Sequence, residues 1–587
     1  MKALRRRDFL KYAALGAAFT FLPRQGSGQA MLGKTAGSGF QPLEKRPNIL
    51  FILTDDQGWN DAHFAGHPYV QTPNLDRFAS QATWFRQFYV AATVCSPSRC
   101  AFMTGHFPAR HEIHGHFATH EQNAARAMPD WLDPKTPTVA ALLKQAGYAT
   151  AHIGKWHLGG GEGAPTPDAY GFDFVRHTTG NKNFWEEGGK ADPFFRAKST
   201  GLFVDETIKF IKEHKDRPFY ANLWTLVPHA PLKPTPEQLK VYENLAPRAD
   251  DPAFGPWMQK YLGNAKDLKS QMQIFCASLT DLDTQIGRLL KTLDELGLAE
   301  NTLVFFSSDN GAEDYRIGNA ANAGVGNTGP LRARKRSMYE GGVRTFGLVR
   351  WPGHVAAGRR DETSVVAGVD WLPTVCKLAG VTVPENIQPD GEDVSDIWCG
   401  AMRPRTKPLH WEWLFQVKGE DYTPPHLTIR DGDWKLFVNH DGTKPELFNI
   451  PKDASELHDV AKENPAVVQA LSAKAIAWTK TLPPSKARDH VAATNEPQDM
   501  PRKQPAKAKQ TANGKPPLDR VAAFKQKDTN HDGKLTLEEY LHNFPDQAEG
   551  RRRFPTFDAN HDGVLSEEEF VTMGKVGQKP AVPAPAK

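Results

Sequence analysis

The sequence predicts an α/β protein with a large sheet flanked by helices, followed by a smaller C-terminal α+β subdomain and a separate helical module. Short apolar runs alternate with helix-like segments from residue 46 to about 400, which is typical of an α/β sheet. Residues 409–437 are rich in strand-forming side chains, and 466–482 have a helical pattern. Two similar acidic loops near the C-terminus indicate the helical module. A chain of 587 residues is long enough for several hydrophobic cores.

Composition divides the chain into six consecutive segments, with the bounds 1–30, 46–400, 401–482, 483–517, 518–575 and 576–587. We interpret the second and third as the main domain and its subdomain, and the fifth as the helical module. The fourth segment is rich in proline, lysine, glutamine and alanine and lacks apolar periodicity, so we predict a disordered linker. We predict that the last segment is a disordered tail.

The first segment resembles the twin-arginine export signal of bacteria. Three arginines at 5–7 precede Phe9 and Leu10, and the apolar run 12–22 is too short to span a bilayer. Small residues at 28–30 suit a cleavage site. The pattern predicts export of the folded protein by the export machinery to the bacterial periplasm, cell surface or extracellular space, with no transmembrane segment in the mature protein. The net charge of +4 is close to balance, so we expect no nucleic-acid partner.

Three apolar runs predict buried strands, and two periodic segments predict helices. Residues 48–54 are apolar without alternation, which indicates a strand buried on both faces. Residues 219–226 and 302–307 predict two further strands of the same sheet. Helical periodicity predicts helices over 138–147 and 272–297.

The cysteines are too few and too scattered for a disulfide scaffold. They are Cys95, Cys100, Cys276, Cys376 and Cys399. We expect free thiols, and a bridge between Cys376 and Cys399 is the weaker alternative.

The two acidic loops match the EF-hand pattern at all its defined positions. Each loop has oxygen-bearing side chains at positions 1, 3 and 5, glycine at 6, a hydroxyl at 9 and glutamate at 12. The predicted ligand positions are Asp528, Asn530, Asp532, Lys534, Thr536, Glu539, Asp558, Asn560, Asp562, Val564, Ser566 and Glu569. We therefore predict two Ca²⁺ sites, and the alternative is a pair of acidic turns that bind no ion.

Polar pairs follow two of the predicted strands. Asp55 and Asp56 come after the first strand, and Asp309 and Asn310 come after another. Ligands collect at the carboxyl ends of strands in doubly wound sheets, so we expect these pairs to converge. Oxygen ligands suit a hard cation, Ca²⁺ before Mg²⁺. The alternative is that each pair forms a turn or a helix cap.

The segment from Cys95 to Arg99 reads CSPSR and matches the pattern C-x-P-x-R. Alone, so short a match also fits a buried cysteine beside a turn-forming proline. Other motifs follow in a fixed order along the chain, namely Asp55-Asp56, Lys155-Trp156-His157, Pro228-His229, Asp309-Asn310-Gly311 and Lys335. On these motifs the chain resembles the type I sulfatases of the alkaline phosphatase superfamily over about residues 47–482. The resemblance implies the alkaline-phosphatase-like large mixed sheet.

The resemblance also implies the nucleophile. Cys95 would be oxidised to formylglycine by a formylglycine-generating enzyme and would complete the shell of the calcium site. A thiolate suits attack on a sulfate ester poorly, whereas a hydrated aldehyde attacks through one hydroxyl and expels sulfate through the other. Arg99 would orient this group, and His157 would assist proton removal from it. A predicted helix from Ser96 to Thr104 would place the nucleophile at the positive end of a helix dipole.

The remaining implied roles concern the substrate. Lys155 and Lys335 would bind the sulfate oxygens, and His229 would contact the sulfate and the leaving-group oxygen. Fixed cations and a divalent ion stabilise the charge that develops during sulfate transfer. A positioned acid assists departure of the alkoxide.

One stretch departs from the family pattern. The usual form around Lys335 is close to P-L-R-G-G-K-G, whereas residues 330–336 read PLRARKR. Bulky side chains replace glycines where the backbone should be permissive. Two interpretations are open. Either the loop has another shape, which weakens the role of Lys335, or its arginines contact an anionic substrate.

Two further groups of side chains are weaker candidates. One is a set of histidines without the spacing of a closed zinc site, which we expect to lie in loops and at a pocket rim, namely His106, His111, His114, His116 and His120. The other is aromatic and lies at 181–185 and 410–413. These aromatic residues either line the substrate mouth or pack in the core and the subdomain seam.

Together these features predict an exported, Ca²⁺-dependent sulfate ester hydrolase with an appended EF-hand pair. By analogy with exported bacterial sulfatases, a sulfated carbohydrate is the preferred substrate class. A phosphate or phosphonate ester hydrolase with the same nucleophile is the nearest alternative. A non-catalytic, calcium-bound surface protein is the alternative from another class.

Overall fold

The computed structural model describes residues 45–160, 163–180, 182–189, 195–265, 267–314, 321–415, 423–496, 520–542, 547–558, 560 and 562–572. The chain divides into two compact units, one up to Pro501 and one from Arg502. The predicted export signal, the C-terminal tail and most of the predicted linker lie outside the described residues. None of the helices in the described part is both long enough and apolar enough to cross a membrane.

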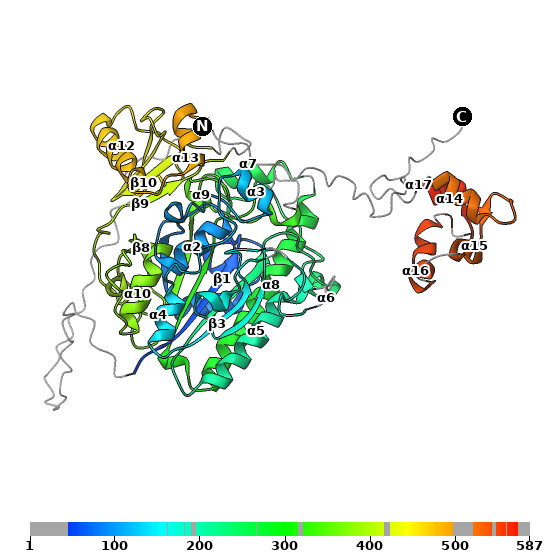
Figure 1. Ribbon diagram of the computed structural model, residues 1–587, viewed down its shortest axis with the longest axis horizontal. Helices are drawn as coiled ribbons and strands as arrows, with labels where there is room; N and C mark the ends of the chain where they lie inside the picture. The colour runs from blue at the N-terminus through cyan, green and yellow to red at the C-terminus, as the bar shows by residue number, and fades with distance from the viewer. Residues whose placement is uncertain are drawn as a thin grey trace, which may run out of the picture. The chain divides into compact units, whose positions relative to one another are not determined.

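A large mixed sheet lies at the centre of the first unit (Figure 1), and it has eight strands. The strand order is β4-β3-β5-β1-β6-β7-β2-β8, and β7 runs antiparallel to its neighbours β6 and β2. The other neighbouring strands pair in parallel. The strands are β1 Asn48–Asp55, β2 Thr83–Tyr89, β3 Ala149–Lys155, β4 Phe174–Thr178, β5 Phe219–Pro228, β6 Thr302–Ser308, β7 Arg344–Arg350 and β8 Arg360–Ala367. The predicted large mixed sheet is confirmed.

The central strand β1 is buried along its whole length. Ile49, Phe51 and Leu53 pack into the core on one face of the sheet, whereas Leu50 and Ile52 pack into the core on the other. A strand with apolar neighbours on both faces has no polar side to alternate with. The continuous apolar run in the sequence therefore has a direct structural cause.

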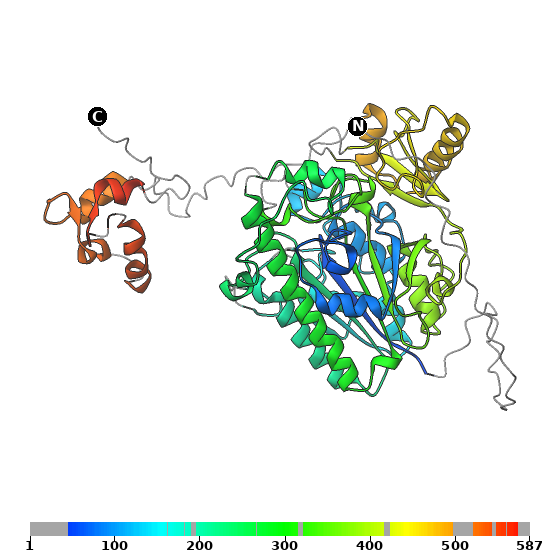
Figure 2. The ribbon, with the colours of Figure 1, turned by 180° about the vertical axis from the view of Figure 1, so that it is seen from behind.

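Helices cover both faces of the sheet (Figures 1 and 2). The core on one face includes residues of α1, α5, α7 and α8, and the core on the other face includes residues of α2, α4 and α10. The helices are α1 Pro73–Ser80, α2 Cys95–Thr104, α3 His120–Ala125, α4 Val139–Gln145, α5 Phe195–His214, α6 Pro236–Lys240, α7 Pro256–Leu262, α8 Leu268–Glu295, α9 Glu340–Val343, α10 Trp371–Leu378 and α11 Ser395–Trp398. The helices predicted over 138–147 and 272–297 correspond to α4 and α8.

A four-stranded antiparallel sheet forms the C-terminal subdomain, with the order β12-β11-β10-β9. Helix α12 packs against it through Leu471, Ala475 and Trp478. The elements are β9 Leu409–Glu412, β10 Leu427–Asp431, β11 Trp434–Val438, β12 Glu446–Asn449, α12 Pro465–Thr479 and α13 Lys486–Thr494.

The predicted linker start at residue 483 is wrong, because α13 follows α12. Ala487 and Val491 of this helix are fully buried. Arg488 donates to the buried Glu412 carboxylate from Nε at 2.7 Å and from Nη2 at 3.1 Å. Two apolar residues among polar ones give a weak helical pattern, and the partner of Arg488 lies far away in the sequence. The ordered subdomain therefore continues beyond 483.

The second unit contains the predicted helical module. Its elements are α14 Arg520–Lys527, β13 Lys534–Leu535, α15 Leu537–Leu541, α16 Gln547–Phe557, β14 Leu565–Ser566 and α17 Glu567–Thr572. β13 and β14 pair antiparallel and join the two loops. A small core that includes Phe524, Tyr540 and Phe570 packs beneath them.

Candidate active site

The predicted site residues meet at one edge of the large sheet. β1, β3, β5 and β6 run in parallel and end there. β2 runs in the same direction, because it is antiparallel to β7, which is antiparallel to β6. The chain segments that leave these strands carry buried polar residues, namely Asp55, Asp56, Cys95, Arg99, Lys155, His157, His229, Asp309 and Asn310, and a later loop adds Lys335. The expected convergence at the carboxyl ends is confirmed.

Four of these residues offer ligand atoms that lie within 4.8 Å of one another, namely Asp55, Asp56, Cys95 and His229. Asp309 and Asn310 lie against the same group. Asp309 Oδ1 accepts a hydrogen bond from the Asp56 amide at 3.2 Å, and Asn310 Nδ2 donates to Asp56 Oδ1 at 2.7 Å. A Cβ on the next residue, Gly311, would lie 1.9 Å from the carbonyl oxygen of Gly341. Only glycine fits after this asparagine.

This donor set fits a hard divalent cation. The buried Oδ1 atoms of Asp55 and Asn310 have no hydrogen-bond partner. Burial, reinforced by neighbouring carboxylates, raises the pKa of Asp56 to about 7 and also raises the pKa of Asp309. A divalent ion satisfies such oxygens and favours the ionised carboxylates. The residues present therefore match the Ca²⁺ site that the sequence predicts.

Helix α2 places Cys95 and Arg99 on the cluster. Arg99 is fully buried and donates to Asp309 Oδ2 from Nε at 3.0 Å and from Nη2 at 2.8 Å. Its Nη1 donates to the Lys155 carbonyl at 2.7 Å. Burial raises the pKa of the Cys95 thiol to about 12, even though Lys155 and Lys335 favour the thiolate. An unmodified thiol at this position stays protonated at neutral pH and is a poor nucleophile.

Two lysines contact the paired carboxylates. Lys155 Nζ lies 2.6 Å from Asp55 Oδ2, and Lys335 Nζ lies 2.6 Å from Asp56 Oδ1. Burial opposes ionisation of Asp55, but Lys155 and further cations hold its pKa well below the ordinary value. Both ammonium groups therefore lie at the cluster, where the sequence analysis expected cations for the sulfate oxygens.

His229 follows β5 and faces the cluster as a neutral ring. Its Nε2 lies 3.6 Å from Asp56 Oδ2, and its Nδ1 lies 2.5 Å from the Ala230 carbonyl oxygen. A carbonyl only accepts, so Nδ1 carries the proton and the neutral ring presents Nε2 as an acceptor. Burial, together with Lys335, holds the pKa of His229 well below its ordinary value.

Arg196 fixes the His229 segment, and the sequence analysis missed it. Its guanidinium donates to the backbone carbonyls of Leu226, His229 and Pro231. Arg196 is only 4% exposed and is the second residue of α5, at least 30 residues before these carbonyls in the sequence. No local motif marks such a contact.

His157 lies beside the cluster without a direct contact to it among the described residues. Its Nε2 lies 3.2 Å from the carbonyl oxygen of Phe117, and its buried Nδ1 has no hydrogen-bond partner. Burial, followed by the charge on Lys155, holds the pKa of His157 well below its ordinary value. A neutral imidazole next to Lys155 is able to accept a proton, which agrees with the predicted role in proton removal.

The unusual loop around Lys335 keeps the backbone conformation of a glycine-rich loop. Ala333 has φ 62° and Arg336 has φ 73°, both in the left-handed region that favours glycine. Both positions have glycine in the usual family pattern, and Lys335 still reaches Asp56, so the bulky side chains do not remove Lys335 from the cluster.

The arginines of the loop are engaged with the protein itself. Arg334 donates to the carbonyls of Glu313, Gly324 and Gly326, and Arg332 stacks 3.7 Å from the ring centroid of Tyr339. Arg336 pairs with Glu313. Glu313 is a second buried residue at the site that the sequence analysis missed.

The weaker aromatic candidates belong to the core. Trp411 and Trp413 are 2% and 3% exposed, and Trp411 Nε1 donates to the Val90 carbonyl at 2.8 Å. These contacts support core and seam packing at 410–413 and not a substrate mouth. Trp185 packs against the core that contains Phe203, and Asn181 lies outside the described residues.

The histidine set is dispersed, and the thiols are free. His114 contacts the buried Glu412, His106 contacts His111, and His120 pairs with Asp130 at the surface. None of the five cysteines is in a disulfide, and Cys376 and Cys399 are not bridged, as expected.

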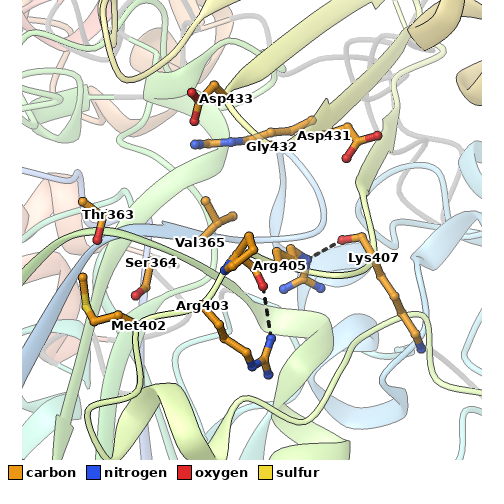
Figure 3. A pocket seen from close by; sticks show the side chains of 12 residues that line it. Thr363, Ser364, Val365, Met402, Arg403, Arg405, Lys407, Asp431, Gly432 and Asp433 are labelled. Atoms are coloured by element: carbon orange, nitrogen blue, oxygen red, sulfur yellow. Dashed lines mark hydrogen bonds between the residues drawn. The ribbon is translucent and has the colours of Figure 1, made fainter.

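A cavity of about 380 Å³ lies between β8 and the β10–β11 turn and contains none of the predicted site residues. Figure 3 shows its lining, which includes Thr363, Arg403, Arg405, Lys407 and Asp433. Arg403 and Arg405 pair with acids outside the lining, and Lys407 Nζ donates to two backbone carbonyls. These three cationic side chains therefore already have partners within the protein.

Comparison with known families decides the identity of this arrangement. The model of the sulfatase family matches residues 47–381. The chain belongs to the sulfatase family. The sulfatase also matches the model of the N-sulphoglucosamine sulphohydrolase C-terminal region at 333–479, and the EF-hand model at 521–544 and 552–573. The predicted resemblance to sulfatases and the predicted EF-hand pair are both confirmed. The chain is a sulfuric ester hydrolase with an EF-hand pair.

Individual relatives agree with this assignment. The sulfatase is 31% identical to arylsulfatase A of Homo sapiens over 466 residues, which cover 73% of this chain and 87% of the relative. It is 32% identical to N-acetylgalactosamine-6-sulfatase of Canis lupus familiaris over 398 residues, which cover 62% of this chain and 69% of the relative. Among solved structures, Ps i-CgsB has a TM-score of 0.61 at 27% identity and matches 74% of this chain and 93% of its own.

Proposed function

We propose that this sulfatase hydrolyses sulfate esters of carbohydrates, using a formylglycine made from Cys95 beside an active-site Ca²⁺. The convergence of Asp55, Asp56, Cys95 and His229 within 4.8 Å carries the proposal. The hydrate of formylglycine would supply a hydroxyl nucleophile at a position where burial keeps an unmodified thiol protonated. The calcium ion supplies charge to the sulfate oxygens and would be held by Asp55, Asp56, Asp309, Asn310 and residue 95.

The other side chains have roles set by their positions. Arg99 lies one turn after residue 95 in α2 and binds Asp309 and the Lys155 carbonyl, so it anchors the helix that carries residue 95. Lys155 and Lys335 offer ammonium groups to the sulfate oxygens. Neutral His157 accepts a proton near residue 95, and His229 would contact the sulfate and the leaving-group oxygen.

The carbohydrate substrate and the export of the chain are proposals on different grounds. A solved structure of Ps i-CgsB contains k-i-k-neocarrahexaose, and that protein is 26% identical to this chain. N-acetylgalactosamine-6-sulfatase is named for a sulfated sugar. The arginine-rich start of the chain supports export to the periplasm or cell surface. We also propose that both EF-hand loops bind Ca²⁺.

A release assay tests the proposed activity. The calcium-loaded full chain is incubated with defined sulfated oligosaccharides and with matched 4-nitrophenyl sulfate and 4-nitrophenyl phosphate. We expect release of sulfate from at least one oligosaccharide and a higher kcat/KM for the sulfate ester than for the phosphate ester. A higher kcat/KM for the phosphate ester contradicts the proposal and favours the phosphate hydrolase.

Two cysteine variants give matched controls, because Cys95 and Cys100 lie on the same helix and are both buried. Cys95→Ala should lower kcat by at least about 10⁴-fold, since it removes the nucleophile. Cys100→Ala should keep most of the activity and should lower only thermal stability. Equal losses in the two variants would show that the effect on kcat is structural.

A further inference from the structure

Four charged side chains at the site form a row of alternating sign. Lys335 Nζ lies 2.6 Å from Asp56 Oδ1 and 3.3 Å from Glu313 Oε2. Arg336 Nη1 then pairs with the other oxygen of Glu313. Asp56, Lys335 and Glu313 have side chains at most 3% exposed, and Arg336 has one that is 13% exposed. The row therefore begins at the proposed metal ligand and ends at the partly buried Arg336.

The negative charge of Glu313 disfavours the binding of an anion beside Lys335. Its carboxylate lies against the ammonium that we assign to the sulfate oxygens. A carboxylate and a sulfate ester compete for the same cation, and like charges nearby repel. Burial opposes ionisation of Glu313, but Arg336 and then Lys335 hold its pKa well below the ordinary value. The carboxylate is therefore charged and needs a second cation.

Arg336 supplies that cation from an unfavourable backbone position. Its φ of 73° lies in the left-handed region, where a side chain is disfavoured relative to glycine. A residue held in such a conformation at a site points to a functional use for its side chain. At this position its guanidinium pairs with the Glu313 carboxylate.

We propose that Arg336 is a positioning residue that keeps Glu313 from competing with the substrate sulfate for Lys335. The proposal rests on the proposed role of Lys335 in sulfate binding. It replaces the hypothesis that Arg336 contacts an anionic part of the substrate. The two ideas differ in which substrates they affect and in the effect of a second substitution at Glu313.

The test compares Arg336→Gly, Glu313→Gln and the double variant in the calcium-loaded full chain. Kinetics are measured on 4-nitrophenyl sulfate, which has no further anion, and on a multiply sulfated oligosaccharide. The Kd of inorganic sulfate is measured by titration calorimetry. Arg336→Gly should raise the KM for both substrates and the Kd of inorganic sulfate by roughly 10- to 100-fold, with a smaller change in kcat. Adding Glu313→Gln should restore both values to within about threefold of wild type.

Several controls keep the outcomes distinct. Glycine accepts the backbone angle at 336, which offsets part of the stability lost with the Glu313 ion pair, and the sulfate Kd is measured below the unfolding temperature determined for each variant. Arg336→Lys retains the charge, so its KM and sulfate Kd should lie between those of wild type and Arg336→Gly. An unchanged sulfate Kd in Arg336→Gly overturns the proposal. So does a loss confined to the oligosaccharide that Glu313→Gln fails to rescue.

Failure of the proposed function has a separate signature. A wild-type protein that releases no sulfate from any ester contradicts the proposed function itself. The calorimetric Kd needs no turnover, so it still tests the relation between Arg336, Glu313 and Lys335 in that case.

Discussion

The two kinds of calcium site that we propose for this chain are built in opposite ways. Each EF-hand loop takes its ligands from one short continuous segment, and the loop backbone already donates to Asp528 and Asp558 at 2.9–3.2 Å. The active-site cluster takes its ligands from several strand ends, and its carboxylates are fully buried. A loop of the first kind depends on local turns. A cluster of the second kind exists only once the large sheet has formed.

This difference predicts different responses to substitution. A buried carboxylate has no water to replace a lost partner, whereas an exposed loop carboxylate such as Asp532 or Asp562 does. Substitutions at the cluster should therefore affect catalysis strongly. Substitutions in the loops should affect ion binding by those loops and little else.

Among substitutions that compare the two kinds of calcium site, the largest effect is expected for Asp55→Asn. The substitution keeps the shape, removes one charge from the proposed calcium site and leaves Lys155 without its 2.6 Å partner. We expect kcat to fall by at least about 10³-fold and bound active-site calcium to be lost. Steady-state kinetics and metal analysis measure both.

Asp61→Asn is the matched control, because Asp61 is equally buried but binds backbone amides and lies outside the proposed metal site. Its carboxylate accepts hydrogen bonds from the amides of Gly58 at 2.7 Å and Asn327 at 2.6 Å. This variant should lose thermal stability while its folded fraction keeps kcat. A wild-type kcat in Asp55→Asn would contradict the proposed metal site.

An intermediate effect is expected in the second unit. Replacing Glu539 and Glu569 together by glutamine should weaken calcium binding by the loops by about 100-fold, because each glutamate is the position that can give two oxygens. We expect kcat/KM for sulfate esters to stay within about twofold of wild type. Calcium titration of the full chain and the ester assay measure the two quantities.

The adjacent residues provide the control for this pair. Glu538→Gln with Glu568→Gln removes the same charge from non-ligand positions and should leave calcium affinity near wild type. A large loss of turnover in the Glu539/Glu569 variant would show that the loops and the catalytic site are coupled.

The smallest effect is expected at the seam between the main sheet and the subdomain. Glu456 Oε1 lies 3.1 Å from Lys435 Nζ, which also binds Glu340 at 2.8 Å. Burial raises the pKa of Glu456 from 4.5 to about 7. Between these pH values the folded state holds a proton that the unfolded state has lost, so this group makes stability fall as pH rises through the window.

Glu456→Gln should remove that contribution. Its unfolding temperature should decline less than that of wild type between pH 4.5 and about 7, by about 1–2 °C. Thermal unfolding at a series of pH values gives the comparison. An identical pH dependence in the two proteins would show that Glu456 is ionised throughout.

The same contrast shows why some features follow from the sequence and others do not. β1 was predictable because an unbroken apolar run of this length is typical of a strand buried on both faces, and Asp55 follows it directly. The EF-hand loops were predictable because the whole pattern is local. The meeting of the two polar pairs followed from their places after strands, but the position of Lys335 was reached through a resemblance, since no local pattern brings its Nζ to 2.6 Å from Asp56.

The missed features depend on contacts between distant segments. Helix α13 is ordered by the contact of Arg488 with Glu412, 76 residues away in the sequence. Arg196 acts through backbone carbonyls of another segment. Arg336 was noticed as a departure from glycine, but its partner Glu313 was not predictable from the spacing.

The central claim is that residue 95 is a formylglycine in the active enzyme. Mass spectrometry of the tryptic peptide 87–99 from a preparation with measured turnover tests it most directly. We predict a peptide whose cysteine has lost its sulfur and carries an aldehyde, in a proportion that rises with specific activity. A fully active preparation in which residue 95 is an intact cysteine would contradict the account.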